Sequence, residues 1–412
     1  MAKVKIQGHA SGTGVLTVTA PNTSTDRTIT LPDSSGTILD STSTLDATKL
    51  SGDLPAISAA SLTNVPKDVT VGGRKNMIIN GDFNIWQRGS SATAFTNSNT
   101  FLTDRFYSRN TGYGASTQEK STDTPDGHSN SIKFVCTSAG GSFGAGDYVR
   151  MHQEIEGYNI VGTKFGTASA KSLTLSFWVK SSITGTNSIG IYNGAANKSF
   201  VSEYTVSSAN TWEKKTISIS AITSGTWSID NTAELRLSFP MGSGSTYTTS
   251  TLDTWLDDFK FSSTNYIDTF GTLNATIQFA GVQLELGSTA TDFEYRSYGE
   301  ELALCQRYYQ NVSKHIVLTG YQNGYSQILV THNLCCPLRA APSVSYEIST
   351  ISAAQATSPD FNSYSITGLA SYDWEFNSTV TSMSINLSSW NGNDDDACFI
   401  WANNDTTFDA EL

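Results

Sequence analysis

The chain has 412 residues, a formal net charge of -12 at pH 7, and only 15% charged residues. This acidic balance, without clustered Lys and Arg, excludes a phosphate-binding footprint, so no nucleic-acid partner is expected. No stretch approaches the roughly 18 apolar residues of a membrane span, so no membrane insertion is expected either. The first 20 residues lack the apolar core of a signal peptide, which predicts synthesis in a cytoplasm without signal-dependent export.

The 5 cysteines are odd in number and match no zinc-binding spacing. Cys335 and Cys336 are neighbours in the sequence and do not readily bridge each other. We therefore expect reduced, mostly buried thiols, as in proteins made in a reducing cytoplasm. A disulfide framework is the alternative interpretation.

Residues 1–74 contain no aromatic side chain, since the first is Phe83. Short apolar stretches near residues 4–6, 15–18 and 28–31 alternate with turn residues, a pattern that indicates short strands. One copy of this segment has too little apolar surface to offset the entropy of ordering it. The sequence therefore predicts an intertwined β stalk in which several chains share one core; a flexible linker is the alternative.

Residues 75–297 are rich in aromatic residues and show strict apolar alternation. In residues 173–180, Leu173, Leu175, Phe177 and Val179 alternate with polar residues and Trp178. Residues 149–156 and 234–239 alternate in the same way. These patterns predict half-buried antiparallel strands of a jelly-roll β-sandwich. Near residue 280 the apolar positions change from odd to even numbers, which predicts a β-bulge at Ala280–Gly281.

Residues 298–310 form the one segment with helical character, a short linking helix. Leu302, Cys305, Tyr308 and Tyr309 fall on one face of this helix and are candidates for contact with a partner subunit. Residues 311–412 return to strand patterns and predict a smaller C-terminal β-sandwich. Within it, Asn323–Gly324 is a strong hairpin signal.

The polar faces of the predicted strands give the best candidate binding site. Trp178 lies on the polar side of its strand, as do four charged or ionisable residues on two others: Arg150, His152, Glu154 and Arg236. If these strands share a sheet, an aromatic platform meets hydrogen-bonding groups, a combination that suits sugars. The alternative is that Trp178 packs under a loop or against a neighbouring subunit.

Several segments resemble bacteriophage fibre proteins. Residues 27–39 look like fibre stalk segments, and residues 45–65 look like their linker repeats. Residues 76–89 and 280–296 resemble the opening and closing strands of a phage jelly-roll module, and residues 299–309 and 409–412 resemble the fibre C-terminal region. The resemblance implies a homotrimeric tail-fibre subunit of the virion, attached through residues 1–74 to the phage tail or another virion protein.

The middle segment also resembles the carbohydrate-binding modules that have a jelly-roll fold. In that family the opening strand and a closing Asp-Asp strand hold a structural calcium, which implies a metal site at Asn80 and Asp82. The closing strand here reads Ala280–Gly281 where paired aspartates are expected. Asp257–Asp258 are alternative carboxylates, although they occur earlier in the chain.

The resemblance implies recognition of a host cell-surface glycan during adsorption. The alternative is a structural head decoration or tail adaptor without receptor binding, because a sugar-binding-like fold does not by itself prove sugar binding. No catalytic motif is present, and no cofactor other than the calcium is implied, so an enzyme is not expected. A depolymerase is the weaker alternative, because carboxylates such as Glu154 and Asp257 are plentiful.

Overall fold

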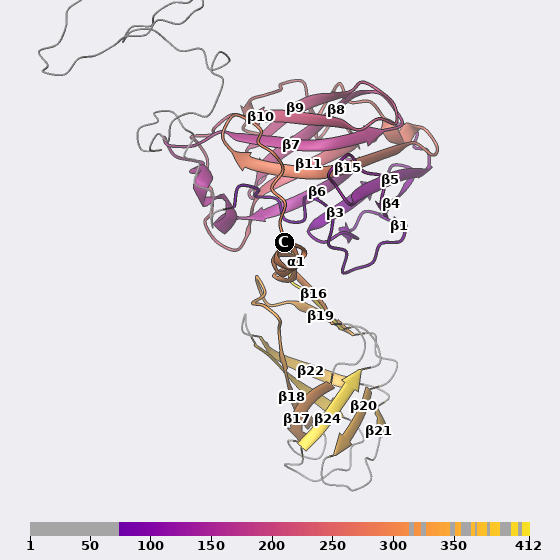
Figure 1. The fold of residues 1–412 in the computed structure, drawn as a ribbon, viewed down its shortest axis with the longest axis vertical. Helices are drawn as coiled ribbons and strands as arrows, with labels where there is room; N and C mark the ends of the chain where they lie inside the picture. The colour runs from indigo at the N-terminus through magenta and orange to yellow at the C-terminus, as the bar shows by residue number, and fades with distance from the viewer. Residues whose placement is uncertain are drawn as a thin grey trace, which may run out of the picture. The chain divides into compact units, whose positions relative to one another are not determined.

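The computed structural model describes residues 74–312, 317–322, 327–346, 351–355, 364–366, 369–376, 380–387, 397–402 and 406–412. The predicted stalk of residues 1–74 therefore lies outside the described residues, apart from Arg74. The described chain is almost entirely β-structure, as predicted (Figure 1).

Two large antiparallel sheets make up the jelly-roll sandwich of residues 93–286. Sheet A has six strands, which in spatial order are β1 (Thr93–Ala94), β4 (Ala115–Ser121), β5 (Ser131–Ser138), β15 (Thr276–Leu286), β7 (Leu173–Ser181) and β10 (Glu213–Ile219). Sheet B has seven, in the order β13 (Trp255–Leu256), β9 (Ser199–Val206), β8 (Gly185–Asn193), β11 (Ala233–Ser243), β6 (Tyr148–Glu156), β3 (Phe106–Thr111) and β2 (Thr100–Phe101). Strands β12 (Thr248–Thr249) and β14 (Ser262–Ser263) form a separate short pair.

The predicted alternation determines which side chains fill the space between sheets A and B. Leu173, Leu175, Phe177 and Val179 of β7 are all completely buried. The Phe177 ring lies 5.2 Å from the ring of Phe239, a residue of β11, so the two sheets share one aromatic core. Burial of these side chains is the main stabilising contribution to the sandwich.

The predicted bulge is present in β15. The pairing of β15 with β7 shifts register between Ala280 and Gln283, and Gly281 has a φ of 56°, in the left-handed region. The extra residue turns the following apolar side chains back toward the core. Phe279 before the bulge and Val282 after it are therefore both buried.

The opening segment 76–85 closes one end of the sandwich through side-chain hydrogen bonds. Asn76 accepts the backbone N–H groups of Ile78 and Leu284 and donates to the carbonyl of Val282. Gln153 of β6 pairs with both backbone groups of Ile79, at 3.0 and 2.8 Å. These contacts fix the segment to both sheets.

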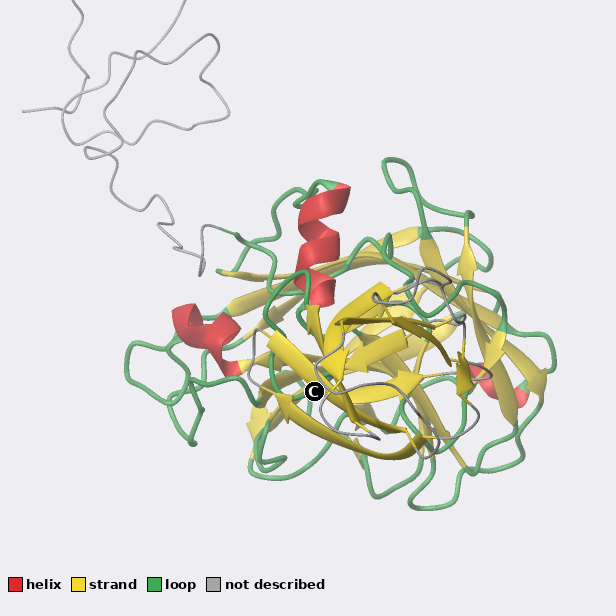
Figure 2. Cartoon of the chain, turned by 90° about the horizontal axis from the view of Figure 1, so that it is seen from below, coloured by secondary structure: helices red, strands yellow, loops and turns green. Residues whose placement is uncertain are grey.

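Helix α1 (Tyr298–Gln306) follows the sandwich and confirms the predicted helix, which ends four residues earlier than expected. Its first turn is capped by Ser297, whose hydroxyl accepts the N–H of Glu300. Figure 2 shows that the helical segments, which include the 3₁₀ turns Gly157–Thr163 and Thr269–Gly271, lie outside the sheets. Among the described residues, no helix has the length and apolarity to cross a membrane.

Two further sheets complete the chain. The joint sheet has three strands, in the order β16 (Tyr309–Val312), β25 (Thr406–Asp409) and β19 (Ser343–Tyr346). The terminal sheet has seven, in the order β21 (Tyr364–Ile366), β20 (Ile351–Gln355), β24 (Ala397–Ala402), β17 (Val317–Gln322), β18 (Gln327–Asn333), β23 (Val380–Leu387) and β22 (Leu369–Phe376). Strands β17 and β18 pair as neighbours, which confirms the hairpin predicted at Asn323–Gly324, although these two residues lie outside the described part.

Candidate functional site

Four of the five predicted glycan-binding residues meet on the outer face of sheet B. Arg150, His152 and Glu154 project from β6, and Arg236 projects from the neighbouring strand β11. The antiparallel register places Arg236 directly opposite Glu154. Because alternate residues of a strand share a face and paired residues are adjacent, the four side chains form one cluster.

Glu154 is the centre of the polar contacts in this cluster. Arg236 Nε lies 3.1 Å from Glu154 Oε1, and the Tyr107 hydroxyl donates to the same oxygen at 3.1 Å. His152 Nε2 is 3.6 Å away from it. A carboxylate with a hydrogen-bond donor and a guanidinium beside it is held in one orientation and kept ionised.

Aromatic rings cover the rest of the cluster. The His152 ring lies 4.8 Å from the ring of Tyr107 and 5.5 Å from that of Tyr192. Arg150 Nη1 donates to the Tyr192 hydroxyl at 3.1 Å. Phe259, from the loop between β13 and β14, lies 4.9 Å from Tyr192 on the same face.

Burial and neighbouring charges set the protonation states. Complete burial, with help from the charges of Arg150 and Arg236, lowers the pKa of His152 to about 4. Burial alone would raise the pKa of Glu154, but the hydrogen bonds and charges from His152, Arg236 and Tyr107 lower it to about 2. At neutral pH the cluster therefore contains a neutral imidazole and an ionised carboxylate.

The face is much less exposed than the alternation predicted. His152 is completely buried, Arg150 is 6% exposed, and Tyr107 and Tyr192 are also buried. The side chains of Arg236 and Glu154 remain 25% and 10% exposed. With the half-buried Phe259 they form the accessible edge of the cluster, which we call the sheet B rim.

Trp178 does not belong to this cluster. It projects from β7, which lies in sheet A, and is paired with Lys214 of β10 and Ala280 of β15. The prediction of one shared patch was therefore wrong for Trp178. Local alternation predicts the side of a strand on which a side chain lies. The sheet to which the strand belongs depends on its pairing with strands far apart in the sequence.

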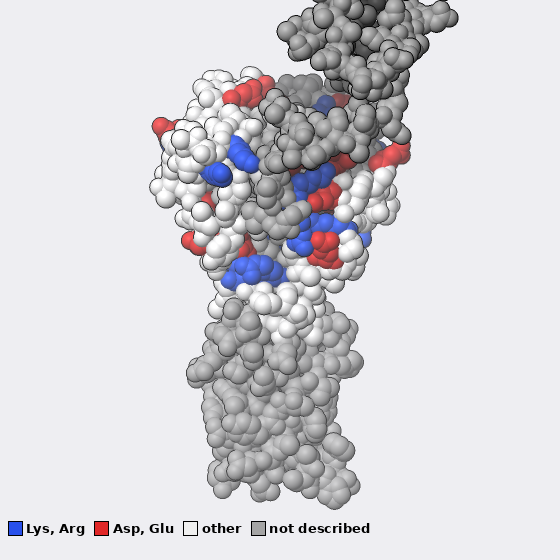
Figure 3. Space-filling model, turned by 60° about the vertical axis from the view of Figure 1, so that its left-hand side comes forward, with Lys and Arg blue, Asp and Glu red and all other residues white. Residues whose placement is uncertain are grey.

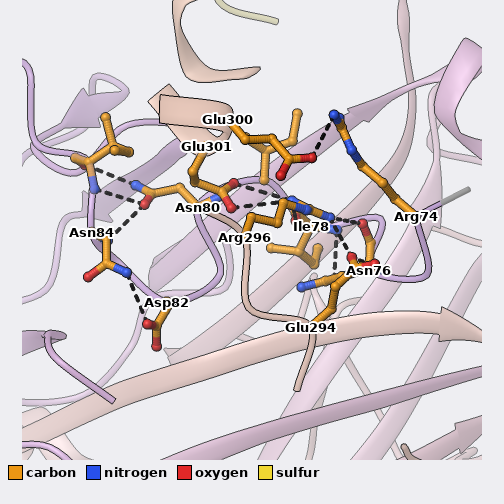
Figure 4. Close-up of polar contacts among 12 residues, drawn as sticks. Arg74, Asn76, Ile78, Asn80, Asp82, Asn84, Glu294, Arg296, Glu300 and Glu301 are labelled. Carbon is orange, nitrogen blue, oxygen red and sulfur yellow. Dashed lines mark hydrogen bonds and ion pairs between the residues drawn. The ribbon is translucent and has the colours of Figure 1, made fainter. Parts of the chain in front are cut away.

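The residues of the predicted calcium site have protein partners of their own (Figure 4). The Asn80 carbonyl oxygen accepts the backbone N–H groups of Asn84 and Ile85, and its amide donates to three oxygens. Asp82 pairs with His128 and accepts from Asn84 at 3.0 Å. The Asn80 side chain is thus used within the chain, whereas Asp82 keeps acceptor positions, and the calcium at Asn80 and Asp82 stays a prediction. Within the described residues, no group of three or more His, Cys, Asp or Glu side chains is arranged to hold a metal.

The residues predicted to contact a partner subunit are packed inside the chain itself. Cys305 and Tyr308 are completely buried with Ile79 and Ile85, and Leu302 packs against the same cluster. Tyr309 is 7% exposed. The guanidinium carbon of Arg88 lies 3.5 Å from the centre of the Tyr309 ring. These contacts attach α1 and β16 to the sandwich and leave little of the four side chains for another subunit.

The thiol prediction holds for the cysteines whose side chains are described. Cys136, Cys305, Cys335 and Cys336 are all free. Cys136 and Cys305 are buried, and burial raises the pKa of both thiols. Cys335 is exposed, in contrast to the expectation for most of them.

Sequence reasoning missed the aromatic members of the cluster. Tyr192 alternates with the buried residues Ile189 and Ile191, so its outward direction was readable from the sequence. Its contact with β6 was not, because β11 lies between β8 and β6 in the sheet. Phe259 comes from a loop that gives no periodic signal.

Comparisons with known proteins give weak likenesses. No family model matches the sequence, and no curated protein matches it. Among solved structures, the enzymatically active domain of bacteriophage CBA120 tailspike protein 4 shares 13% identity, with a TM-score of 0.29 over 52% of this chain and 21% of that one. The match therefore spans about a fifth of that tailspike chain.

Several of the other similar structures are carbohydrate-binding modules. TmCBM61 in complex with β-1,4-galactotriose shares 10% identity, with a TM-score of 0.28 over 52% of this chain and all of that one. The family 11 module of Clostridium thermocellum in complex with a mixed-linked tetrasaccharide shares 13% identity, with a TM-score of 0.25 over 49% of this chain and all of that one. Likenesses of this strength do not assign the chain to a family.

Proposed function

We propose that the chain is a bacteriophage virion fibre subunit that recognises a glycan on the host surface and acts by binding rather than by catalysis. The proposal includes a homotrimer attached to the tail, or to another virion protein, through residues 1–74. It is supported by the resemblance of residues 27–39, 45–65 and 76–89 to phage fibre segments, and by the all-β sandwich that follows them.

The sheet B rim is the observation that carries glycan recognition. Arg236 and Glu154 present a cation and a carboxylate held in a fixed arrangement, and Phe259 supplies an aromatic surface beside them. The buried Tyr107, His152 and their neighbours keep Glu154 ionised and oriented before any ligand arrives. Fixed polar groups beside an aromatic ring are what a sugar requires. Figure 3 shows Lys and Arg side chains close to Asp and Glu side chains on its face of the described residues.

Binding to host glycans tests this role. Soluble protein is expected to block phage adsorption and to bind isolated host surface polysaccharide. The variants Arg236→Ala and Phe259→Ala are each expected to weaken polysaccharide binding about tenfold, the scale of a lost charged or aromatic contact. The matched control is Lys133→Ala, which removes a half-buried ion pair with Glu119 on sheet A.

Two outcomes would favour the structural alternatives. Adsorption that continues unchanged in excess soluble protein would indicate a head decoration or tail adaptor. Release of reducing ends from the polysaccharide would indicate a depolymerase.

The oligomeric state is a separate test. Native mass spectrometry of the full chain is expected to give three times the 44.3 kDa monomer. A variant that begins at residue 74 is expected to lose the trimer, since the shared core is proposed for the preceding segment. A monomeric full-length protein would contradict the fibre architecture.

A further inference from the structure

A second surface site, separate from the sheet B rim, lies where the segment after β15 returns to the opening segment. A small pocket there is lined by Asp82, Asn84, Phe293, Tyr295, Tyr298 and Glu301, together with Arg296. Figure 4 shows the polar residues of this region converging from the opening segment and from the start of α1.

Two tyrosines at this pocket are unusually exposed. The exposed fractions of Tyr295 and Tyr298 are 59% and 64%, although most large aromatic side chains of the sandwich are buried. Tyr295 is supported from beneath, because its ring lies 5.0 Å from Phe293 and 5.8 Å from His128. An exposed aromatic ring on a rigid base is a ready surface for the C–H face of a sugar.

Arg296 joins the opening segment to the start of α1 at the same place. Its side chain is only 4% exposed, and its two terminal nitrogens donate to the backbone carbonyls of Ile78 and Asn76 and to the carboxylates of Glu294 and Glu301. Its Nε–H has no partner among the described residues. This nitrogen is itself buried, so a ligand in the pocket does not reach it.

The carboxylates of the pocket retain unused acceptor capacity. Asp82 accepts from Asn84 and pairs with His128, and Glu301 accepts from the backbone of Asn80 and from Arg296. A carboxylate has about four acceptor positions, so both can still accept hydroxyl groups. The pocket thus offers carboxylate acceptors and two aromatic faces.

The charge around the pocket selects among sugars. Asp82 and Glu301 line it, and Asp292 lies close enough that its charge, after burial and the charge of Asp82, helps to raise the pKa of Tyr295. The one lining cation, Arg296, is already paired with Glu294 and Glu301. This negative field opposes uronic and sialic acids and favours uncharged rings.

We propose that Tyr295 or Tyr298 stacks against a single neutral pyranose ring at the mouth of this pocket, and that hydroxyl groups of the ring donate to Asp82 and Glu301. The site is independent of the sheet B rim and stands whether or not the rim binds sugar. It would add a second contact to a glycan or engage a separate branch.

Titration of the full-length protein with methyl glycosides tests the site. The panel holds the neutral methyl hexopyranosides of glucose, galactose, mannose and N-acetylglucosamine, with methyl glucuronide as the acidic member, and binding is followed by saturation-transfer NMR. At least one neutral member is expected to bind, and the glucuronide about tenfold more weakly or not at all.

Variants locate the binding. Tyr295→Ala and Tyr298→Ala are expected to weaken it about tenfold, whereas Tyr298→Phe, which keeps the ring, is expected to retain most of it. The matched control is Tyr158→Ala, because Tyr158 is 49% exposed but lies on the 3₁₀ turn Gly157–Thr163. Melting temperatures establish that every variant is folded.

The results separate this site from the sheet B rim. Loss of glycoside binding in the Tyr295 and Tyr298 variants, with binding retained in Arg236→Ala, supports the pocket. Unchanged binding in both tyrosine variants, preferential binding of the glucuronide, or no binding by any neutral glycoside would overturn it. None of these results depends on whether the rim variants alter adsorption.

Discussion

His152 and Glu154 make the stability of the sandwich depend on pH. The folded state holds the pKa of His152 at about 4, below the ordinary value near 6.5. As pH falls, His152 therefore becomes protonated in the unfolded chain before it does so in the folded one. The pKa of Glu154, at about 2, is also below its ordinary value. Stability from His152 is therefore lost between about pH 6.5 and 4, and stability from Glu154 between about pH 4.5 and 2.

Urea unfolding at pH 7 and pH 4.5 measures the stability that is lost when His152 becomes protonated. A shift of this size for His152 corresponds to about 3 kcal/mol, most of it lost by pH 4.5. The variant His152→Gln, which does not titrate, is expected to show a correspondingly smaller drop between the two pH values. Equal drops in the wild type and the variant would show that His152 is protonated in the folded state.

Individual residues also show where sequence reasoning stops. Alternation correctly predicted the inward direction of Phe177 and the outward direction of Arg150 and His152. It placed Trp178 on the wrong sheet, because β7 pairs with β15, which is about 100 residues later in the chain. Asn80 and Asp82 match a calcium motif in residue type, but their side chains are used by the local turn and by His128.

Among the elements, β15 has a sharp local requirement at its bulge. Gly281 has a φ of 56°, and a Cβ added there would lie 2.5 Å from the ring of His128. The variant Gly281→Ala is expected to destabilise the sandwich by roughly 1–3 kcal/mol, through backbone strain and the clash with His128. Denaturant unfolding measures this change.

Gly141→Ala is the matched control for that variant. Gly141 has no atom within 4 Å of an added Cβ and does not have a positive φ, so its substitution is expected to change stability by less than about 0.5 kcal/mol. An equally small change in stability for Gly281→Ala would show that the backbone of the bulge adjusts to the added methyl group without strain. The bulge itself was predictable, because the parity of apolar residues changes at that point in the sequence.

At the scale of the whole molecule, the order of elements was largely predictable and their packing was not. The sandwich, the helix and the return to strands follow from apolar periodicity and turn residues. The attachment of the last strand was not readable, because it depends on distant ion pairs. Arg105 of the sandwich is buried against Glu411, and Arg88 contacts Asp409 and Glu411 at 3.3 Å.

The joint sheet connects the sandwich to the terminal sheet through more than one crossing of the chain. The chain leaves the joint sheet after β16, returns to it before β19, leaves again, and returns through β25. No single peptide bond therefore carries the whole connection between these parts. After cleavage at one crossing, the pairing of β16 and β19 with β25 would still hold the two parts together.

A protease site inserted between residues 312 and 317 tests this resistance. After cleavage, the two fragments are expected to elute together in native size-exclusion chromatography and to separate only in denaturant. Fragments that separate without denaturant would show that the joint sheet does not hold the two parts together.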